Sequence, residues 1–205
     1  MTVDGFIAVV IAFFIVTVSP GPANIAVATV SMSQGRKRGL LFGFGLSCGL
    51  AFWGLVAATG LGAVLQASEY ALMAIKLLGG GYLLWLAFQS ARTAARPATK
   101  PHSMNGSGNW FLRGLILNLS NPKAVVAWMA ALSMGLGNGE GAMHLVIITL
   151  VCMVLGVINY TGHAVVFSNT KIMKAYEKAR RLVEGVVSGL FALAGLGLLK
   201  SALSR

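Results

Sequence analysis

The stretch "VSPGPAN", Val18 to Asn24, decides the fold of this chain, because it interrupts a run that otherwise has the composition of a membrane-spanning helix. The run extends from Phe6 to Val30 and contains no charged residue. Spanning the hydrocarbon core of a bilayer takes roughly 20 helical residues. Two prolines within such a helix remove backbone hydrogen bonds that lipid cannot replace. The break is therefore tolerated only if the freed groups are buried in protein or face a water-filled cavity.

The composition of the 205-residue chain is that of an integral membrane protein. Hydrophobic residues make up 57% and charged residues 10% of the chain, and its mean hydropathy is +0.79, whereas a soluble domain is roughly 45 to 50% apolar. Six charge-poor windows are long enough to span a membrane: Phe6 to Val30, Gly39 to Leu65, Tyr70 to Ser90, Trp110 to Met134, Ala142 to Ser168 and Leu182 to Leu199. We therefore expect an all-α integral membrane protein with six transmembrane helices. The first window lacks the basic start of a signal sequence and is expected to stay in the mature chain.

Basic residues are concentrated in alternate connections between these windows. They follow the first, third and fifth windows: Arg36, Lys37 and Arg38, then Arg92, Arg96 and Lys100, then Lys171, Lys174, Lys178, Arg180 and Arg181. Cytoplasmic loops of membrane proteins carry an excess of lysine and arginine. The three connections are therefore predicted to be cytoplasmic and both termini to lie outside. Topology explains the net charge of +11, so no nucleic acid is expected as a partner.

The longest connection divides the chain into two halves of three windows each. Residues 93–109 are rich in proline, glycine, serine and asparagine, and they are predicted to form a cytoplasmic linker within a single transmembrane domain. The first repeat covers about residues 5–92 and the second about 110–201. A shift of 102 positions aligns Pro20 with Pro122 and gives nine identities over 41 pairs. Three spans per half invert the second repeat, as in many secondary transporters; chance similarity between apolar segments remains the alternative.

Each half has a proline near the middle of its first window, preceded by a residue that caps helix N-termini well. Ser19 precedes Pro20 and Asn121 precedes Pro122, and proline is well suited to the first position of a helix. Helices 1 and 4 are therefore predicted to break at midplane prolines and to restart there with free N–H groups. Those N–H groups lie at the positive end of the helix dipole, where a carboxylate binds favourably. A packing kink remains the alternative for either proline alone.

Polar side chains beside the two breaks complete a predicted substrate site. Asn24, Asn118 and Asn121 offer amide donors and acceptors. Lys123 lies roughly 16 to 20 Å along the helix from either end of its window, where a lysine is costly unless it has a partner or a wet cavity. The predicted substrate-binding residues are Ser19, Pro20, Gly21, Pro22, Asn24, Asn118, Asn121, Pro122 and Lys123.

The other ionisable residues carry weaker signals. His163 lies in the fifth window and is, with Lys123, a candidate for proton coupling; a hydrogen-bonded packing histidine is the alternative. Lys76 is expected to extend toward the membrane surface. No carboxylate pair, metal-ligand cluster or activated nucleophile is visible at one depth, so no catalytic residue, metal or cofactor is predicted. An intramembrane enzyme is the least favoured alternative function, and a channel or assembly subunit without coupled transport is the other.

Two motifs resemble those of a known transporter family. "SPGPAN" followed by "SQGRKRGLLFGFGLSCG" is similar to the start of the LysE/RhtB family of bacterial amino-acid exporters, and "LNLSNPKAVVAW", Leu117 to Trp128, is similar to its second motif. "KLLGGGYLLWLAF" resembles the third span of that family. The resemblance implies a six-span transporter of the bacterial cytoplasmic membrane that expels amino acids or close derivatives, uses the proton motive force and forms oligomers. The family's motif positions correspond to Pro20, Gly21 and Pro22 and to Asn121, Pro122 and Lys123.

One position departs from the pattern of this family. Many members carry an aspartate shortly after the glycine-rich start of the second span, and the matching residue here is Leu50. Asp4, Glu69 and Glu140 are peripheral and Glu184 begins the sixth window, so no buried carboxylate is expected. The sequence therefore predicts a secondary transporter that exports a small zwitterion by alternating access. Its carboxylate would be held by the two helix N-termini and by the lysine of the second motif.

Overall fold

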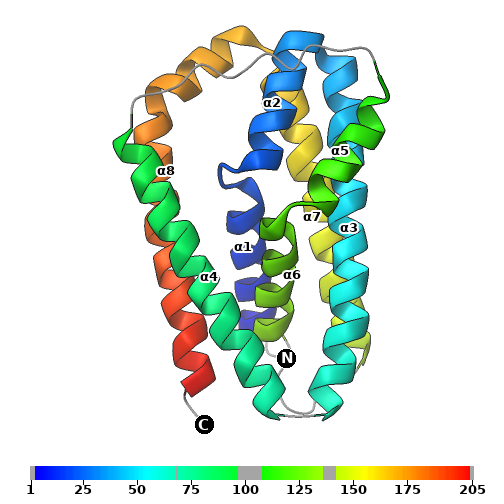
Figure 1. The fold of residues 1–205 in the computed structure, drawn as a ribbon, viewed down its shortest axis with the longest axis vertical. Coiled ribbons are helices and arrows are strands. Elements are labelled where there is room, and N and C mark those ends of the chain that lie inside the picture. Colours follow the sequence, from blue (N-terminus) through cyan, green and yellow to red (C-terminus); the bar gives the residue numbers. More distant parts are fainter. Residues whose placement is uncertain (1–2, 68, 97–107, 136–141, 204–205) are drawn as a thin grey trace.

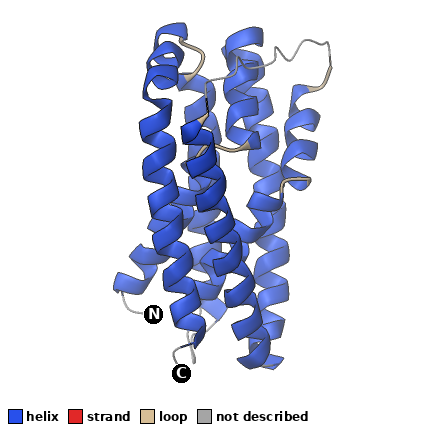
Figure 2. Cartoon of the chain, turned by 60° about the vertical axis from the view of Figure 1, so that its left-hand side comes forward, coloured by secondary structure: helices blue, strands red, loops and turns tan. Residues whose placement is uncertain are grey.

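The computed structural model describes residues 3–67, 69–96, 108–135 and 142–203. Within these residues the chain forms eight helices and no strands (Figures 1 and 2). The helices are α1 (Val3–Val18), α2 (Pro22–Gln34), α3 (Arg36–Ala67), α4 (Glu69–Ala95), α5 (Trp110–Leu119), α6 (Pro122–Gly135), α7 (Ala142–Val166) and α8 (Thr170–Leu203). The predicted all-α class is confirmed.

Three of the described helices are long and apolar enough to cross a membrane, over Arg36–Gly60, Met143–Val166 and Ala175–Leu203. The pairs α1–α2 and α5–α6 meet the same test if each bent pair is counted as one span. Helix α4, with 27 residues, is not among these candidates. The structure thus shows a helical membrane protein with three to five candidate spans, and the arrangement of six spans stays a prediction.

The outward faces of the helices are apolar, as a lipid environment requires. Helix α7 exposes 43% of Ile147, 56% of Leu150, 57% of Val154 and 55% of Ile158. These residues recur at helical spacing and form one continuous apolar stripe. An exposed stripe of this kind is unusual on a soluble monomer, so it supports the assignment to the membrane.

Both breaks predicted from the prolines are present. The chain bends by 53° between α1 and α2 and by 59° between α5 and α6. In Figure 1, α1 and α2 run from the bottom to the top of the bundle, whereas α5 and α6 run from the top to the bottom. Helix α1 accordingly contacts α6, and α2 contacts α5. The two broken helices are therefore antiparallel, which is the relation that an inverted repeat requires.

The first broken helix restarts two residues later than predicted. Helix α2 begins at Pro22, and its N-cap is Gly21, which has an extended backbone and no side-chain hydrogen bond. The prediction that Ser19 caps a helix beginning at Pro20 is therefore wrong. The physical reason is that the hydroxyl oxygen of Ser19 accepts a hydrogen bond from the ammonium of Lys123 at 2.5 Å, while its O–H donates to the carbonyl oxygen of Val16 at 2.6 Å.

The second broken helix restarts where it was predicted to restart. Helix α6 begins at Pro122, and the Oδ1 atom of Asn121 accepts a hydrogen bond from the backbone N–H of Lys123 at 3.1 Å. This is the usual geometry of an asparagine N-cap followed by proline at the first helical position. The structural counterpart of Pro122 is therefore Pro22, the second proline of the first motif.

Small residues allow two helix pairs to pack closely. A Cβ atom at Gly114 of α5 would overlap the carbonyl oxygen of Phe42 of α3. Similarly, a Cβ atom at Gly195 of α8 would lie 3.0 Å from the carbonyl oxygen of Gly80 of α4. Such close backbone approach is typical of helix pairs in membranes, and it makes α3–α5 and α4–α8 tightly joined units.

Both termini lie at one end of the bundle, and the α2–α3 and α7–α8 junctions lie at the other (Figure 1). The α2–α3 junction turns at Gly35, whose φ of 85° is a left-handed conformation that glycine favours. Arg36–Arg38 follow this turn, and Lys171 lies at the start of α8. The basic segments at these two junctions therefore share one end of the molecule, opposite the termini.

Two helices extend five or more residues beyond their predicted windows. Helix α4 continues to Ala95 instead of ending at Ser90, and α8 begins at Thr170 instead of Leu182. At 1.5 Å per residue α8 is about 50 Å long, more than the hydrocarbon core of roughly 30 Å. Its first turns cross the end of the bundle before the helix runs down beside α4 (Figure 1). Most of the predicted linker at 93–109 lies outside the described residues.

Candidate functional site

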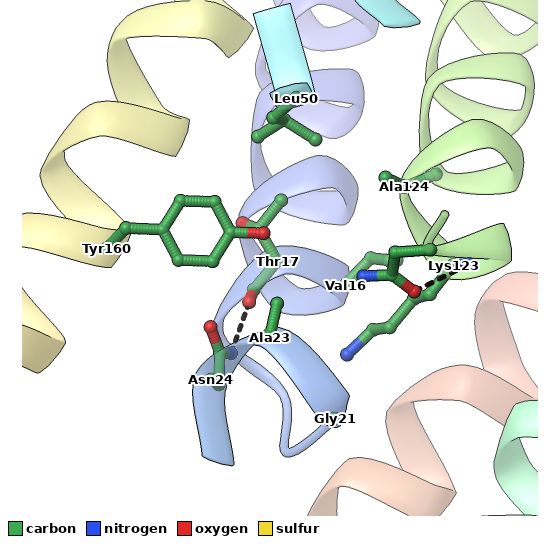
Figure 3. Close-up of a pocket in the computed structure, with 11 residues that line it drawn as sticks. Val16, Thr17, Gly21, Ala23, Asn24, Leu50, Lys123, Ala124 and Tyr160 are labelled. Carbon is green, nitrogen blue, oxygen red and sulfur yellow. Dashed lines mark hydrogen bonds between the residues drawn. The ribbon is translucent and has the colours of Figure 1, made fainter. Parts of the chain in front are cut away.

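The two breaks meet at one pocket, whose walls come from α1, α2, α3, α6 and α7 and the residues of the breaks (Figure 3). It contains about 300 Å³ of space between atoms, counting the part open to the surroundings. The residues that line it are Val16, Thr17, Gly21, Ala23, Asn24, Leu50, Asn121, Lys123, Ala124, Ala127 and Tyr160. The lining is mostly apolar with a few polar groups, as in most ligand sites. Four predicted site residues, Gly21, Asn24, Asn121 and Lys123, are brought together here.

Lys123 extends from the start of α6 to the end of α1. Its Nζ atom donates to the carbonyl oxygen of Ser19 at 2.9 Å, to the hydroxyl of Ser19 at 2.5 Å and to the carbonyl oxygen of Pro20 at 3.4 Å. The side chain is only 9% exposed. Helix α1 ends at Val18, and the carbonyls at the end of a helix carry the negative pole of its dipole. The end of the broken helix therefore compensates the buried charge of Lys123.

Asn24 holds the same helix end from α2. Its Nδ2 atom lies 2.6 Å from the carbonyl oxygen of Thr17, 3.1 Å from that of Val18 and 2.9 Å from that of Ser19, so two amide hydrogens serve three acceptors. Asn159 of α7 adds hydrogen bonds of 3.2 Å to Thr17 and to the Oδ1 atom of Asn24. These side chains pair the carbonyls that the break leaves free, which is how an interrupted helix is tolerated in an apolar bundle.

A second group of hydrogen bonds holds the end of α5. The Nδ2 atom of Asn118 donates to the hydroxyl of Tyr160 at 3.2 Å, and the Nδ2 atom of Asn121 donates to Asn118 at 3.3 Å. The indole N–H of Trp53 donates to the carbonyl oxygen of Leu119, the last residue of α5, at 3.1 Å. Asn118 is therefore next to the pocket and positions the tyrosine that lines it.

The two restarting helices differ at their N-termini. Asn121 caps α6 through the backbone N–H of Lys123. Helix α2 has no side-chain cap, and Gly21, Ala23 and Asn24 at its start line the pocket. The positive end of the α2 dipole thus faces the pocket, an arrangement that favours an anion. Free N–H groups were expected at both breaks, and of the two restarting helices only α2 lacks a side-chain cap.

The remaining predicted residues shape the breaks without lining the pocket. Ser19 is fully buried and bonded to the lysine, and the carbonyl oxygen of Pro20 accepts from the same ammonium group. Pro22 and Pro122 occupy the first positions of α2 and α6. These four residues therefore contribute backbone geometry, and Ser19 contributes a hydroxyl partner.

His163 and Lys76 are not among the residues that line the pocket. The Nδ1 atom of His163 is 2.9 Å from the carbonyl oxygen of Asn159, one turn earlier in α7, and its ring centroid is 5.5 Å from that of Phe167. This environment matches the alternative of a packing histidine. Lys76 donates to the hydroxyl of Ser201 at 3.1 Å and so joins α4 to α8.

Three polar residues of this region and one buried carboxylate were not among the predicted site residues. Thr17 and Tyr160 line the pocket, and Asn159 is 4% exposed beside it. Each is a polar residue within an apolar window, and this feature is the signal that identifies such positions. Tyr160 and Asn159 are also consecutive, so they reach the break from one turn of α7.

Glu184 is the missed carboxylate, and the prediction that no carboxylate is buried is wrong. Its side chain is only 4% exposed, with the Ser90 hydroxyl of α4 as hydrogen-bonding neighbour and with an electrostatic interaction to Lys123. The residues Val187 and Phe191 are 8% and 1% exposed. Their spacing from Glu184 places all three on the inward face of α8. The hydropathy window placed Glu184 at a helix end because it ignored which face the residue occupies.

Comparison with known proteins agrees with this geometry. The family model of LysE type translocators matches residues 14–202. The chain belongs to this family. The translocator is similar to the threonine efflux protein of Salmonella typhi, with 30% identity over 96% of this chain and 98% of that protein. It is also similar to the threonine efflux protein of Escherichia coli K12, with 28% identity over 96% of this chain and 98% of that protein.

A further relative of this translocator is the homoserine/homoserine lactone efflux protein of Salmonella typhimurium LT2, with 27% identity over 98% of each chain. No solved structure matches the chain. Family membership makes the protein a transporter, which excludes the intramembrane enzyme among the alternatives. Leu50, the residue that departs from the family pattern, lines the pocket and is 2% exposed. The departure therefore lies in the candidate site itself.

Proposed function

We propose that this translocator is a secondary transporter that exports a small neutral amino acid, or a closely related small zwitterion, across the bacterial cytoplasmic membrane. The observation that carries the proposal is the pocket at the meeting point of two antiparallel broken helices, with Lys123 and the uncapped start of α2 in its wall. The relatives named for threonine and homoserine efflux support the substrate class. Both amino acids combine a carboxylate, an ammonium and a small hydroxyl side chain.

The substrate carboxylate would bind at the start of α2, within reach of Lys123. The ammonium of this lysine has three hydrogens, directed at two oxygens of Ser19 and one of Pro20. The contact with Pro20 is the longest, at 3.4 Å, and the carbonyl of Ser19 also accepts from Asn24. Lys123 can therefore turn one hydrogen toward a carboxylate at little cost to the end of α1.

Other groups of the lining would bind the substrate ammonium and hydroxyl. The hydroxyl of Tyr160 and the side chain of Asn121 belong to this lining and offer oxygen acceptors. Leu50, Ala124 and Ala127 make the rest of the lining apolar. A charged side chain would lose its hydration there without gaining a partner, so we expect a preference for small neutral substrates.

We infer a six-span topology in which each half contains one broken helix and two continuous helices. The basic α2–α3 and α7–α8 junctions would face the cytoplasm and both termini the outside, consistent with their placement at opposite ends of the bundle (Figure 1). Alternating access would occur by movement of the two inverted halves around the pocket, with the breaks as hinges. The proton gradient would drive export, and of the two predicted coupling residues Lys123 is the one that lines the pocket.

Transport by the purified protein in proteoliposomes tests the proposal. Wild-type protein should move threonine or homoserine against its concentration gradient, and an uncoupler should stop this movement. Lys123→Ala should reduce uphill transport at least tenfold while the protein remains folded and inserted. Lys76→Ala is the matched control, because this lysine bonds to Ser201 and is not among the residues that line the pocket.

Two results would contradict the proposed function. Full transport by Lys123→Ala would remove the role of the lysine in binding. A wild-type flux that stops at equal concentrations and ignores the uncoupler would identify a channel instead of a coupled transporter.

A further inference from the structure

We propose that Glu184 is the proton-carrying carboxylate of this transporter, held between α8 and α4 beside Ser90 and coupled electrostatically to Lys123 in the pocket. The inference rests on the proposed function, because it names the residue through which a proton gradient would drive export. It follows from the position of the carboxylate in the bundle and from the groups around it.

Glu184 is a buried acidic residue between α8 and α4. Its side chain is 4% exposed and that of Ser90 is 6% exposed, so the two polar groups face each other inside the α4–α8 contact. A carboxylate in the membrane region is expensive, and such residues mark ion paths and proton relays. The hydroxyl of Ser90 is a neutral neighbour that can donate to the ionised carboxylate and accept from the protonated one. The site therefore accommodates both protonation states.

The carboxylate lies on the face of α8 that looks toward the pocket. Phe191 follows Glu184 by two helical turns on the same face, and the centroid of its ring lies 5.8 Å from the Nζ atom of Lys123. The level of the ammonium is thus about 10 Å along α8 from the level of the carboxylate. Charges at such a separation inside a protein are weakly screened. The protonation state of one group therefore changes the free energy of the other.

Apart from Lys123 of α6, the titratable groups that interact electrostatically with Glu184 lie on its own helix. They are Arg180 and Tyr176 of α8. From α4 the neighbouring polar group is the hydroxyl of Ser90. Among the described residues, Lys123 is thus the charged group that connects Glu184 to the substrate pocket, whereas Arg180 lies toward the end of the bundle with the basic junctions.

Helices α4 and α8 are joined firmly enough to move together. The hydroxyl of Ser188, one turn after Glu184, donates to the carbonyl oxygen of Ala87 at 2.8 Å. Gly195 and Gly80 bring the two backbones into contact farther along. The pair contacts α6 and α1 of the broken helices. A change of charge at Glu184 therefore alters the attraction between the α4–α8 pair and the helix that carries Lys123.

The proton balance of the cycle is simple. An O–H bond forms on the carboxylate of Glu184 when a proton arrives from the outer side, and the same bond breaks when the proton leaves to the cytoplasm. One proton moves inward for each substrate molecule that moves outward, and no other bond is made. The position of Glu184 in the first half of α8 places it near the end of the bundle that carries the basic junctions.

Glu184→Gln tests the assignment, because it removes the titratable group and keeps the shape of the side chain. Two assays are run on the same proteoliposomes: uphill transport under an imposed pH gradient, and exchange of labelled for unlabelled substrate at equal pH. Exchange needs no net proton movement. We expect Glu184→Gln to lose uphill transport at least tenfold and to keep exchange within about threefold. The matched control is Glu177→Gln, which changes an exposed glutamate two turns earlier in the same helix and should leave both assays unchanged.

The outcomes separate this inference from the proposed function. Uphill transport by Glu184→Gln within twofold of wild type overturns the role of Glu184 alone. Wild-type export that ignores the pH gradient overturns the proton coupling in the proposed function and, with it, the role of Glu184. Failure of the wild-type protein to move any amino acid overturns the proposed function and the inference with it. If Glu184→Gln also loses exchange, both assays are repeated with Glu184→Asp. Recovery of both assays with a shifted pH profile supports the assignment, and no recovery overturns it.

Discussion

Replacing Asn24 by leucine should destabilise the protein through the broken end of α1. The change keeps the approximate size of the side chain and removes its amide. In the structure this amide lies within 2.6 to 3.1 Å of the carbonyl oxygens of Thr17, Val18 and Ser19. The residue is 6% exposed, so water cannot easily take the place of the lost donor.

The magnitude follows from counting which carbonyls keep a partner. Thr17 still accepts from Asn159 at 3.2 Å, and Ser19 still accepts from Lys123 at 2.9 Å. Val18 keeps no other side-chain donor among the described residues. The loss of two amide hydrogen bonds costs about 1 to 3 kcal/mol, and one unpaired, partly buried carbonyl costs about 1 to 2 kcal/mol more. We therefore expect the free energy of unfolding to fall by about 2 to 5 kcal/mol.

Thermal unfolding of the purified protein in detergent, followed by circular dichroism, measures this effect. For a chain of this size about 2 to 4 °C of Tm corresponds to 1 kcal/mol, so the Tm should fall by roughly 5 to 15 °C. Asn109→Leu is the control, because Asn109 caps α5 at an exposed site by accepting from Leu112 at 3.1 Å and should cost only about 1 kcal/mol. Asn24→Asp should be at least as harmful as Asn24→Leu, since it sets a carboxylate against the negative end of α1. A Tm for Asn24→Leu equal to or above that of Asn109→Leu would refute the reasoning.

Two glycine substitutions probe the pocket and the helix contacts separately. A Cβ atom at Gly21 would lie 3.0 Å from the Nζ atom of Lys123, and the extended backbone there accepts alanine. Gly21→Ala should therefore lower transport severalfold in a flux assay. Its Tm should stay within about 3 °C of wild type in a parallel unfolding assay. Gly114→Ala should lower the free energy of unfolding by about 1 to 3 kcal/mol, because the new methyl group overlaps the carbonyl oxygen of Phe42. Gly185→Ala, at a helical position with open space around it, should leave the Tm unchanged or slightly raised; an equal loss in both variants would contradict the packing argument.

The sequence predicted the breaks well because proline acts locally. A proline in an apolar window removes a backbone donor wherever the chain folds, so the interruptions near Pro20 and Pro122 could be located without tertiary information. The starting residue of α2 could not, since two prolines and two possible caps compete within Ser19 to Pro22. Capping preferences favour Ser19, yet its hydroxyl bonds to Val16 and to the ammonium of the distant lysine. A contact across 104 positions decides that choice.

The roles of the polar residues were less predictable than their positions. Asn24 and Lys123 were expected to bind a ligand, and the structure shows that both also pair the backbone of α1. Glu184 was assigned to a helix end by hydropathy, whereas the heptad spacing to Phe191 places it on the inward face. A window average discards the angular position of a residue on its helix, and the angular position determines whether a carboxylate faces water or the bundle.

A break in a membrane helix exposes two opposite poles a few residues apart, and in this chain the two poles are used differently. The end of α1 presents carbonyl oxygens and the start of α2 presents N–H groups. Lys123 occupies the negative pole through Ser19 and Pro20, so the proposed site leaves the start of α2 for the substrate carboxylate. The same ammonium lies 5.8 Å from the ring centroid of Phe191 of α8, the helix that carries the buried carboxylate of Glu184. Under the two proposals, substrate occupancy of the break and the charge on Glu184 are thus linked through a single ammonium group, and substitution of Lys123 should uncouple them.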